Sequence, residues 1–328
     1  MKNFIRVRTL HLCTQALLGI LLFAVNPLTK AALERDESWG FSAGESTLRL
    51  PHFDEEGLVL TSLAVAPNDK LLAVGGQLGD QAIIRIYANS DTGPSQLEEF
   101  LIERAQSTVP KLIWLGDNTT LVAGLEFFSA EEMTQQIELH IFEKKAKGDE
   151  FEEKDPIGFE DDDSSLLSLK ADPSDSDKVW CLTSNQENRG RIYQGMISEA
   201  NASNERTLDF PQALAVSKDK IALIHIESPL MVKVFDKHKP EELKDKKSFF
   251  KLQNERSIDL EFKSPKVLIS DAKFLEKELI LVGRARSSEQ VEGHLEDFLL
   301  ASRTIQGREE NKIDWDVYAG SSKEREWG

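Results

Sequence analysis

The sequence predicts an all-β fold in which one small antiparallel sheet recurs along the chain. Three observations support this prediction. A unit of apolar strands and polar turns occurs five times, the units begin at nearly even spacing, and helical periodicity is poor almost everywhere. The chain has 328 residues, of which 40% are hydrophobic and 30% are charged, so it can bury a sizeable core.

The recurring unit is a short apolar strand, a tight turn, a second apolar strand, a polar loop and a third strand. One residue marks the first strand of each copy: Leu63, Leu112, Leu167, Leu214 and Ile269. Successive marks lie 49, 55, 47 and 55 residues apart. Strands repeating at about fifty residues are typical of the blades of a β-propeller. We therefore expect four-stranded antiparallel blades, of which five are recognisable.

The strands of a unit differ in pattern. The first two are nearly continuous apolar runs, which predicts burial on both faces. Seven residues of the second strands are expected in the interior: Leu72, Val74, Leu121, Ile221, Leu223, Leu279 and Leu281. The third strand often alternates, as at residues 84–87, which predicts a position nearer the rim.

A charge-rich fourth strand is expected at the outer edge of each unit, where charge discourages pairing with other chains. The candidates are residues 97–103, 149–155, 206–211, 246–252 and 312–320. Changing a charged residue there, such as Glu99 or Lys247, is expected to alter stability little. Residues 46–53 form one more candidate outer strand, which leaves three alternatives: a five-bladed ring with an irregular join, a six-bladed ring, or the front part of a longer ring.

Residues 62–76 and 83–93 (SLAVAPNDKLLAVGG and IIRIYANSDTG) carry a resemblance to a known family. Together they resemble one unit of a WD-repeat-like β-propeller, and the likeness extends over about residues 46–320. The third strands here end in Tyr-Ala, Phe-Glu or Phe-Asp where that family has Trp-Asp. The family's hydrogen-bond network is therefore not carried over. The resemblance implies a scaffold that binds proteins or peptides through loops at the faces of the ring.

The first 32 residues are predicted to be a signal peptide, followed by a linker at 33–45 and the propeller at 46–328. Basic residues precede an apolar core at 16–25, and Ala31 and Ala32 supply a small-residue cleavage site. The core is too short to span a bilayer, although an uncleaved N-terminal anchor is the alternative. We expect a secreted or periplasmic protein that is not inserted in a membrane after cleavage.

The net charge of −17 would become −21 on cleavage, because four basic residues and no acidic residue would be removed. Nucleic acids require clustered basic residues, so nucleic-acid binding is not expected. Cleavage would also remove Cys13 and leave Cys181 alone, in an apolar run typical of a buried thiol.

The sequence identifies no catalytic, cofactor-binding or metal-ligating residue. The six histidines lack ligand spacing, and His225 between two isoleucines is interpreted as a core or channel residue. The acidic residues 161–163, 172, 175 and 177 could attract Ca²⁺, but they lack the spacing of a calcium loop and are interpreted as a solvated turn. Asn118 and Asn201 match glycosylation acceptors expected in turns, and their use is left open.

Two functions remain. The first is a binding scaffold without a cofactor, whose partner is a protein, a peptide or another ligand, because a propeller fold implies no chemistry of its own. The alternative is a hydrolase or lactonase-like enzyme, which would need several His, Asp or Glu side chains converging in the central channel.

Overall fold

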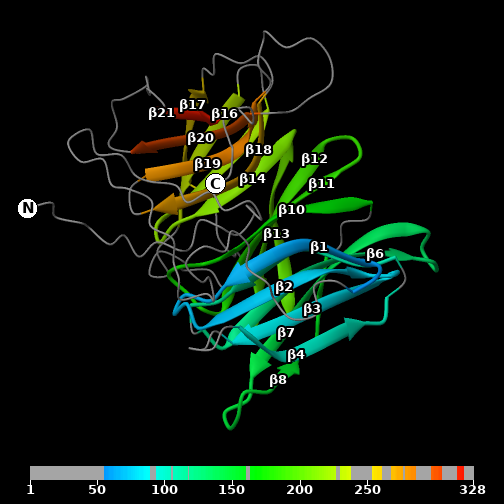
Figure 1. The fold of residues 1–328 in the computed structure, drawn as a ribbon. Helices are drawn as coiled ribbons and strands as arrows, with labels where there is room; N and C mark the ends of the chain where they lie inside the picture. The colour runs from blue at the N-terminus through cyan, green and yellow to red at the C-terminus, as the bar shows by residue number, and fades with distance from the viewer. Residues whose placement is uncertain are drawn as a thin grey trace, which may run out of the picture. The chain divides into compact units, whose positions relative to one another are not determined.

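The computed structural model describes residues 55–88, 94–104, 106–116, 118–159, 163–226, 230–237, 253–260, 267–275, 278–285, 297–304 and 316–320 (Figure 1). The regular structure in these ranges is entirely β-strand. The expected signal peptide, the linker and the strand at 46–53 lie outside the described residues. Within the described ranges, no helical segment has the length and hydropathy that crossing a bilayer requires.

The strands form five antiparallel sheets, which we number 1 to 5 in chain order. Sheet 1 contains β1 (Leu58–Val65), β2 (Leu71–Leu78), β3 (Gln81–Ala88) and β4 (Ser95–Ile102). Sheet 2 contains β5 (Thr108–Trp114), β6 (Thr120–Ser129), β7 (Thr134–Lys144), β8 (Phe151–Glu153) and β9 (Ile157–Gly158). Sheet 3 contains β10 (Ser164–Ala171), β11 (Lys178–Asn185), β12 (Arg189–Met196) and β13 (Asn201–Asp209).

Sheet 4 contains β14 (Pro211–Val216), β15 (Lys220–Ile226), β16 (Leu230–Asp236) and β17 (Gln253–Leu260). Sheet 5 contains β18 (Val267–Leu275), β19 (Glu278–Ala285), β20 (Asp297–Thr304) and β21 (Asp316–Gly320). In every sheet the strands are neighbours in sequence order, and in sheet 2 the short β9 also pairs with β7. This confirms the predicted fold class, an all-β chain of antiparallel blades: four of the described sheets have four strands and sheet 2 has five.

The chain divides into two compact units. Unit 1 comprises Met1–Leu166 and Ile197–Asn201, and it holds sheets 1 and 2. Unit 2 comprises Leu167–Met196 and Ala202–Gly328, and it holds sheets 4 and 5 with most of sheet 3.

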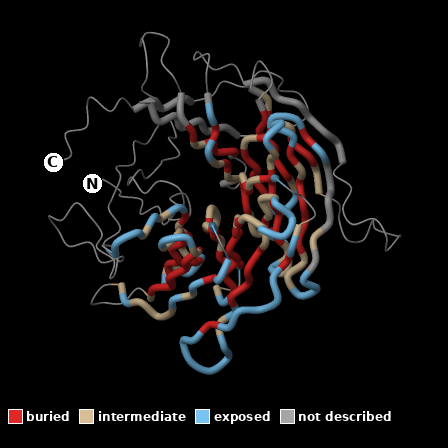
Figure 2. Tube along the Cα trace, turned by 90° about the vertical axis from the view of Figure 1, so that its right-hand side faces the viewer, coloured by how far each residue is buried: buried red, intermediate tan, exposed pale blue. Residues whose placement is uncertain are grey.

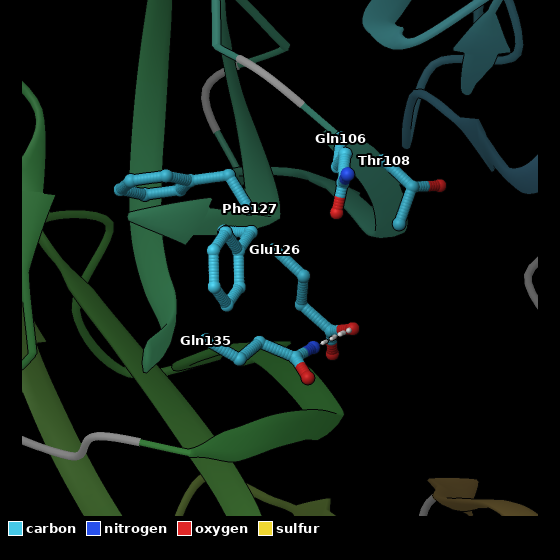
Figure 3. Close-up of a pocket in the computed structure, with 6 residues that line it drawn as sticks. Gln106, Thr108, Glu126, Phe127 and Gln135 are labelled. Atoms are coloured by element: carbon cyan, nitrogen blue, oxygen red, sulfur yellow. Dashed lines mark hydrogen bonds between the residues drawn. The ribbon is translucent and has the colours of Figure 1, made fainter. Parts of the chain in front are cut away.

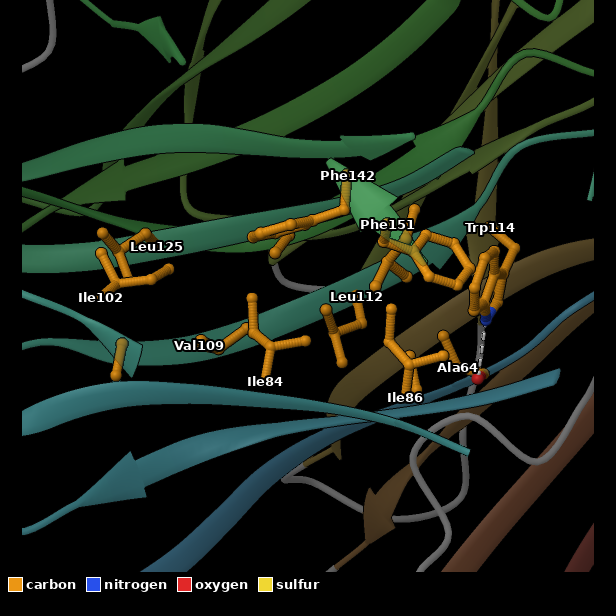
Figure 4. Close-up of a cluster of buried hydrophobic side chains, with 14 of the residues drawn as sticks. Ala64, Ile84, Ile86, Ile102, Val109, Leu112, Trp114, Leu125, Phe142 and Phe151 are labelled. Atoms are coloured by element: carbon orange, nitrogen blue, oxygen red, sulfur yellow. Dashed lines mark hydrogen bonds between the residues drawn. The ribbon is translucent and has the colours of Figure 1, made fainter. Parts of the chain in front are cut away.

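The core of unit 1 lies between sheets 1 and 2 (Figure 4). Ile84 and Ile86 of β3 face Leu112 of β5 and the aromatic rings of β7 and β8 there. The indole nitrogen of Trp114 donates a hydrogen bond to the carbonyl of Ala64 at 3.1 Å. The polar atom of this large side chain is thereby satisfied inside the core.

The core of unit 2 lies on both sides of sheet 4. One cluster joins sheets 3 and 4 through Trp180, Leu214 and Leu223, among others. The second joins sheets 4 and 5 through Ala213, Ile224 and Leu281, among others. Sheet 4 is therefore buried on both faces, as a blade between two neighbours must be.

The second strands agree with the sequence prediction. All seven residues expected in the interior are at most 7% exposed, and Figure 2 shows buried residues running along the strands with exposed ones at the turns. The first strands differ from the prediction. In β1 and β10 buried and partly exposed residues alternate, so one face of each packs less tightly.

The predicted rim position of the third strand is wrong for β3, whose six central residues are all buried. They include Arg85, which is 4% exposed. Its guanidinium binds Glu55 and lies 2.7 Å from a carboxylate oxygen of Glu99. The alternation of the sequence reflects a buried ion pair, so Glu99 is expected to contribute more to stability than an exposed charge of an outer strand does.

The outer strands agree in part. β4, β13 and β21 overlap the expected segments, and β8 is a three-residue strand inside its segment. The outer strand of sheet 4 is β17, which begins at Gln253, one residue after the segment expected to form it. Residues 246–252, including Lys247, lie outside the described residues. Asn201 is the first residue of β13, so the prediction that it sits in a turn is wrong.

In four sheets the first strand carries one residue more than the second strand opposite it, which is a β-bulge. The register shifts at 60–62 in β1, 108–111 in β5, 211–213 in β14 and 269–271 in β18. Bulges increase twist and redirect side chains. The bulged Thr61 donates to the carbonyl of Val109 in sheet 2 at 2.6 Å, and the bulged Gln212 accepts from the amide of Ile269 in sheet 5 at 3.0 Å.

Candidate functional site

Each sheet has two ends, and we call the end at which the first strand begins the entry end. The second-to-third strand turn and the end of the fourth strand lie there too. In unit 1 the entry ends of both sheets lie together, because β1 and β5 run side by side in the same direction. Thr61 and Ser62 bond Val109, and Ala64 bonds Trp114 further along both strands.

Exposed apolar side chains gather at the entry ends. The described residues contain five large exposed hydrophobic side chains: Val59, Leu101, Met133, Phe210 and Leu268. Each lies at the entry end of its own sheet, and Met133, in the β6–β7 turn, is 72% exposed. A single exposed apolar residue is ordinary. Five residues scattered over the surface at random would not be expected to lie, each one, at the entry end of its own sheet.

The opposite ends of the sheets are polar. The β1–β2 turn contains Asn68 and Lys70, and the β7–β8 loop contains two exposed ion pairs, Lys144 with Asp149 and Lys145 with Glu150. Asn118 lies in the β5–β6 turn and links it to the β1–β2 turn, since its side-chain oxygen accepts from the amide of Asn68 at 2.8 Å. The described residues at this end of unit 1 include no large exposed hydrophobic side chain, and in this respect the two ends differ.

A pocket of about 210 Å³ opens at the entry end of sheet 2 (Figure 3). Six residues from three strands and one preceding segment line it: Gln106, Thr108, Glu126, Phe127, Phe128 and Gln135. Gln106 and Thr108 lie on one side of the pocket, and Glu126 and Gln135 lie on the other. Gln106 has a φ of 51°, which is the left-handed backbone conformation that few non-glycine residues adopt.

Glu126 is the charged residue of the pocket. One carboxylate oxygen accepts from the amide of Leu166 at 2.5 Å, and the other accepts from the side-chain amide of Gln135 at 3.1 Å. Burial raises the pKa of Glu126, and this effect exceeds the lowering by the Leu166 hydrogen bond and by the charge of Lys111. The hydroxyl oxygen of Thr108 is buried with no hydrogen-bond partner among the described residues.

Glu126 occupies a position where sheets 1 and 5 have glycine and sheet 4 has His225. It pairs with the last residue before the bulge of β5, as Gly76, Gly283 and His225 do in their sheets. A Cβ at Gly76 or Gly283 would lie 2.1 or 2.2 Å from a backbone oxygen of the first strand. The pocket is lined by Thr108 and Glu126, the pair that precedes the bulge in sheet 2.

The acidic neighbourhood of sheet 3 is a structural link. Asp172 is 5% exposed, so its interpretation as a solvated turn residue is wrong. Its carboxylate accepts from Lys237 at 2.8 Å, from Trp180 at 2.9 Å and from Ser174. Burial opposes ionisation, but these hydrogen bonds outweigh it and lower the pKa of Asp172. The residues 161 and 162 lie outside the described residues, and Asp175 pairs with Lys178 at 2.8 Å.

A second titratable cluster lies in sheet 2. His140 is 4% exposed, and its two ring nitrogens lie 2.6 Å from a Glu153 oxygen and 3.2 Å from a Glu138 oxygen. Arg104 approaches Glu138 to 3.4 Å and lies over the ring of Phe127. Burial lowers the pKa of His140, but the two carboxylates outweigh it, so the pKa is raised.

The remaining single residues agree with the sequence interpretation. Cys181 is buried, and burial raises the pKa of its thiol, which makes it unreactive. His225 is 3% exposed.

In unit 2, Lys170 of β10 and Asp271 of β18 form an ion pair of 2.5 Å between the first strands of sheets 3 and 5. No group of His, Cys, Asp and Glu in the described ranges has the arrangement of a metal site.

Sequence reasoning missed the pocket. Glu126 sits in an apolar run (LVAGLEFFS) that was interpreted only as a buried strand. A signal was present: aligning the second strands of the units sets polar residues, Glu126 and His225, against the glycines at 76 and 283.

No family model and no curated protein matches the sequence. Among solved structures, the chain is similar to a protein from Lactobacillus plantarum, with a TM-score of 0.49, 11% identity and coverage of 78% of this chain and 69% of that one. It is also similar to the Cps50 (Swd1) β-propeller domain of Myceliophteria thermophila, with a TM-score of 0.46, 10% identity and coverage of 74% and 70%. For the β-propeller domain of the Trilobed protease from Pyrococcus furiosus, the values are 0.44, 12%, 80% and 80%. These likenesses concern the fold.

Proposed function

We propose that this chain is an exported scaffold that binds a protein or peptide partner at the entry end of unit 1. The observation that carries the proposal is the difference between the two ends of this unit. Val59, Leu101 and Met133 expose apolar surface at the entry end, beside a pocket, while the described residues at the opposite end expose no large hydrophobic side chain.

Burial of apolar side chains is the main favourable term in protein association. An end that combines apolar side chains with a pocket offers both contact area and a place for one anchoring residue.

Selection of binders tests the proposal. Random short peptides displayed on phage would be selected against the immobilised full chain. The recovered peptides would then be measured against a Leu101→Asp/Met133→Asp variant. Its control is Gly116→Asp/Ala146→Asp, which adds the same charge at the opposite end, where Gly116 has open space and Ala146 is exposed.

We expect the entry-end variant to lose binding and the control to keep it. Equal binding by both variants, or failure to recover any binder, would contradict the proposal. Hydrolysis of a lactone or ester by the purified chain would favour the enzymatic alternative.

Export is part of the proposal. It rests on the basic residues at the start of the chain, the apolar core at 16–25 and the small residues before position 33. Sequencing of the N-terminus of protein from its native host should begin near Ala32 or Leu33. Recovery of chains that start at Met1 from a membrane fraction would show that the segment is retained as an anchor.

A further inference from the structure

We propose that the pocket at the entry end of sheet 2 binds the guanidinium group of an arginine side chain presented by the partner, with Glu126 as its counter-ion. The inference rests on the proposed binding function and specifies the chemistry of one contact. It depends on the size of the pocket, the charge of its lining and the free hydrogen-bonding capacity there.

The size of the pocket suits one side chain. Sites for drug-sized ligands enclose about 300–1,000 Å³. The pocket measures about 210 Å³, which is too small for such a ligand but sufficient for the end of one long side chain.

The charge of the lining favours a cation. Glu126 is the one ionisable residue among the six that line the pocket. Each of its carboxylate oxygens accepts one hydrogen bond, and a carboxylate oxygen has capacity for about two. Burial raises the pKa of Glu126 although the charge of Lys111 lowers it, and a further cation in the pocket would favour the ionised carboxylate.

The remaining groups favour guanidinium over ammonium. Arginine has five N–H donors in a planar fork, and its plane stacks on aromatic rings. Gln106, Gln135 and Phe128 line the pocket together with Thr108, whose hydroxyl oxygen is buried with no hydrogen-bond partner among the described residues. The chain already uses this chemistry beside the pocket, where Arg104 lies 5.1 Å from the centre of the Phe127 ring.

The experiment compares N-acetyl-arginine amide with N-acetyl-citrulline amide, which has nearly the same shape but no charge. Binding of each to the full chain would be measured by titration calorimetry. We expect the arginine compound to bind about tenfold more tightly, which corresponds to about 1.4 kcal/mol. Its affinity should fall as the pH is lowered through the pKa of Glu126, and the citrulline compound should show no such change. Equal affinities of the arginine and citrulline compounds for the full chain would overturn the inference, and this result would require no variant.

Two variants locate the effect. Glu126→Gln keeps an acceptor for the amide of Leu166 but removes the charge, and it should abolish the preference for arginine. Glu131→Gln removes an exposed charge from the nearby β6–β7 turn and should preserve the preference. Retention of the preference in a folded Glu126→Gln variant would overturn the assignment.

The outcomes separate this inference from the proposed function. Selected peptides that bind at the entry end, without any arginine preference or effect of Glu126→Gln, would overturn the inference and leave the scaffold intact. Loss of all entry-end binding would contradict the proposed function itself. Binding of neutral oligosaccharides that depends on Glu126 would assign the pocket to carbohydrate and overturn the inference.

Discussion

Three buried groups of this chain, Arg85, Asp172 and His140, each bind partners on neighbouring strands or turns. Removing one partner of a buried ion pair leaves the other charge uncompensated, which costs more than the pair itself contributes. Exposed residues can therefore matter for stability through the buried group that they bind.

Glu99→Ala tests this at sheet 1. Glu99 is about one-third exposed, yet it binds the guanidinium of Arg85, whose side chain is 5% exposed. We expect a loss of about 1–3 kcal/mol in the free energy of unfolding, because the buried guanidinium of Arg85 would keep its ion pair with Glu55 but lose the one with Glu99. Urea melts should show no such loss for Glu103→Ala, an exposed glutamate just beyond β4. Equal, negligible losses would restore the original expectation for outer-strand charges.

His140 gives the fold a defined dependence on pH. Its pKa is raised above the ordinary 6.5 by Glu138 and Glu153, while Arg104 faces Glu138 from the segment after β4. The stabilisation from protonated His140 should be complete below about pH 6.5 and lost as the pH rises through the folded-state pKa. Unfolding measured across this range should show the decline in the wild type and a flatter profile in His140→Gln. Parallel profiles would mean that His140 is not protonated in the folded chain.

At the scale of strands and sheets, apolar runs predicted the second strands well because these strands are buried on both faces. The β-bulges were not predictable, since an extra residue leaves no periodic signal in strands this short. The outer strand of sheet 4 was assigned to the charge-rich residues 246–252, whereas β17 begins at Gln253. An edge strand is held by backbone hydrogen bonds, so its side chains say little about its position.

Leu223→Ala measures the burial of a second strand. Leu223 is fully buried in β15, and we expect a loss of about 2–5 kcal/mol from transfer and cavity terms. Leu101→Ala, at a side chain 47% exposed, should change stability by less than about 0.5 kcal/mol in the same urea melts. Similar losses for the two variants would contradict the observed register of β15.

Gly283→Ala measures the close approach of strands before a bulge. The added Cβ would lie 2.2 Å from the carbonyl oxygen of Leu268, so the backbone of β18 or β19 would have to shift. We expect a loss of about 1–3 kcal/mol, as overpacking generally produces. Gly116→Ala, where a Cβ would meet nothing within 4 Å, is the control and should show almost no change.

At the scale of the whole molecule, the all-β fold class and the order of the blades followed from repeat spacing, whereas the sequence left the number of blades open. The candidate site was not predictable, because it depends on which side chains three strands bring together at one end of sheet 2. Links between sheets were equally invisible in the sequence. Lys237 and Asp172 lie 65 residues apart and join the β10–β11 turn to the end of β16.

Lys237→Ala tests how far that link supports unit 2. Its side chain is 4% exposed and that of Asp172 is 2% exposed. Removal should cost about 3–5 kcal/mol, because the aspartate would remain buried without its counter-ion. Lys218→Ala, an exposed lysine in the β14–β15 turn, is the matched control. A loss no larger than that of the control, in thermal or urea unfolding, would show that the link is dispensable.

The junctions between successive sheets bear on how such a chain can change over evolutionary time. Thr61 bonds Val109, Ser168 accepts from the amide of Leu214, and Gln212 accepts from the amide of Ile269. In each case a side chain of one first strand meets the backbone of the next. Duplication of one complete unit would reproduce both halves of such a contact, whereas insertion of part of a unit would separate them. Growth or loss by whole units is therefore the change that this architecture accepts most readily.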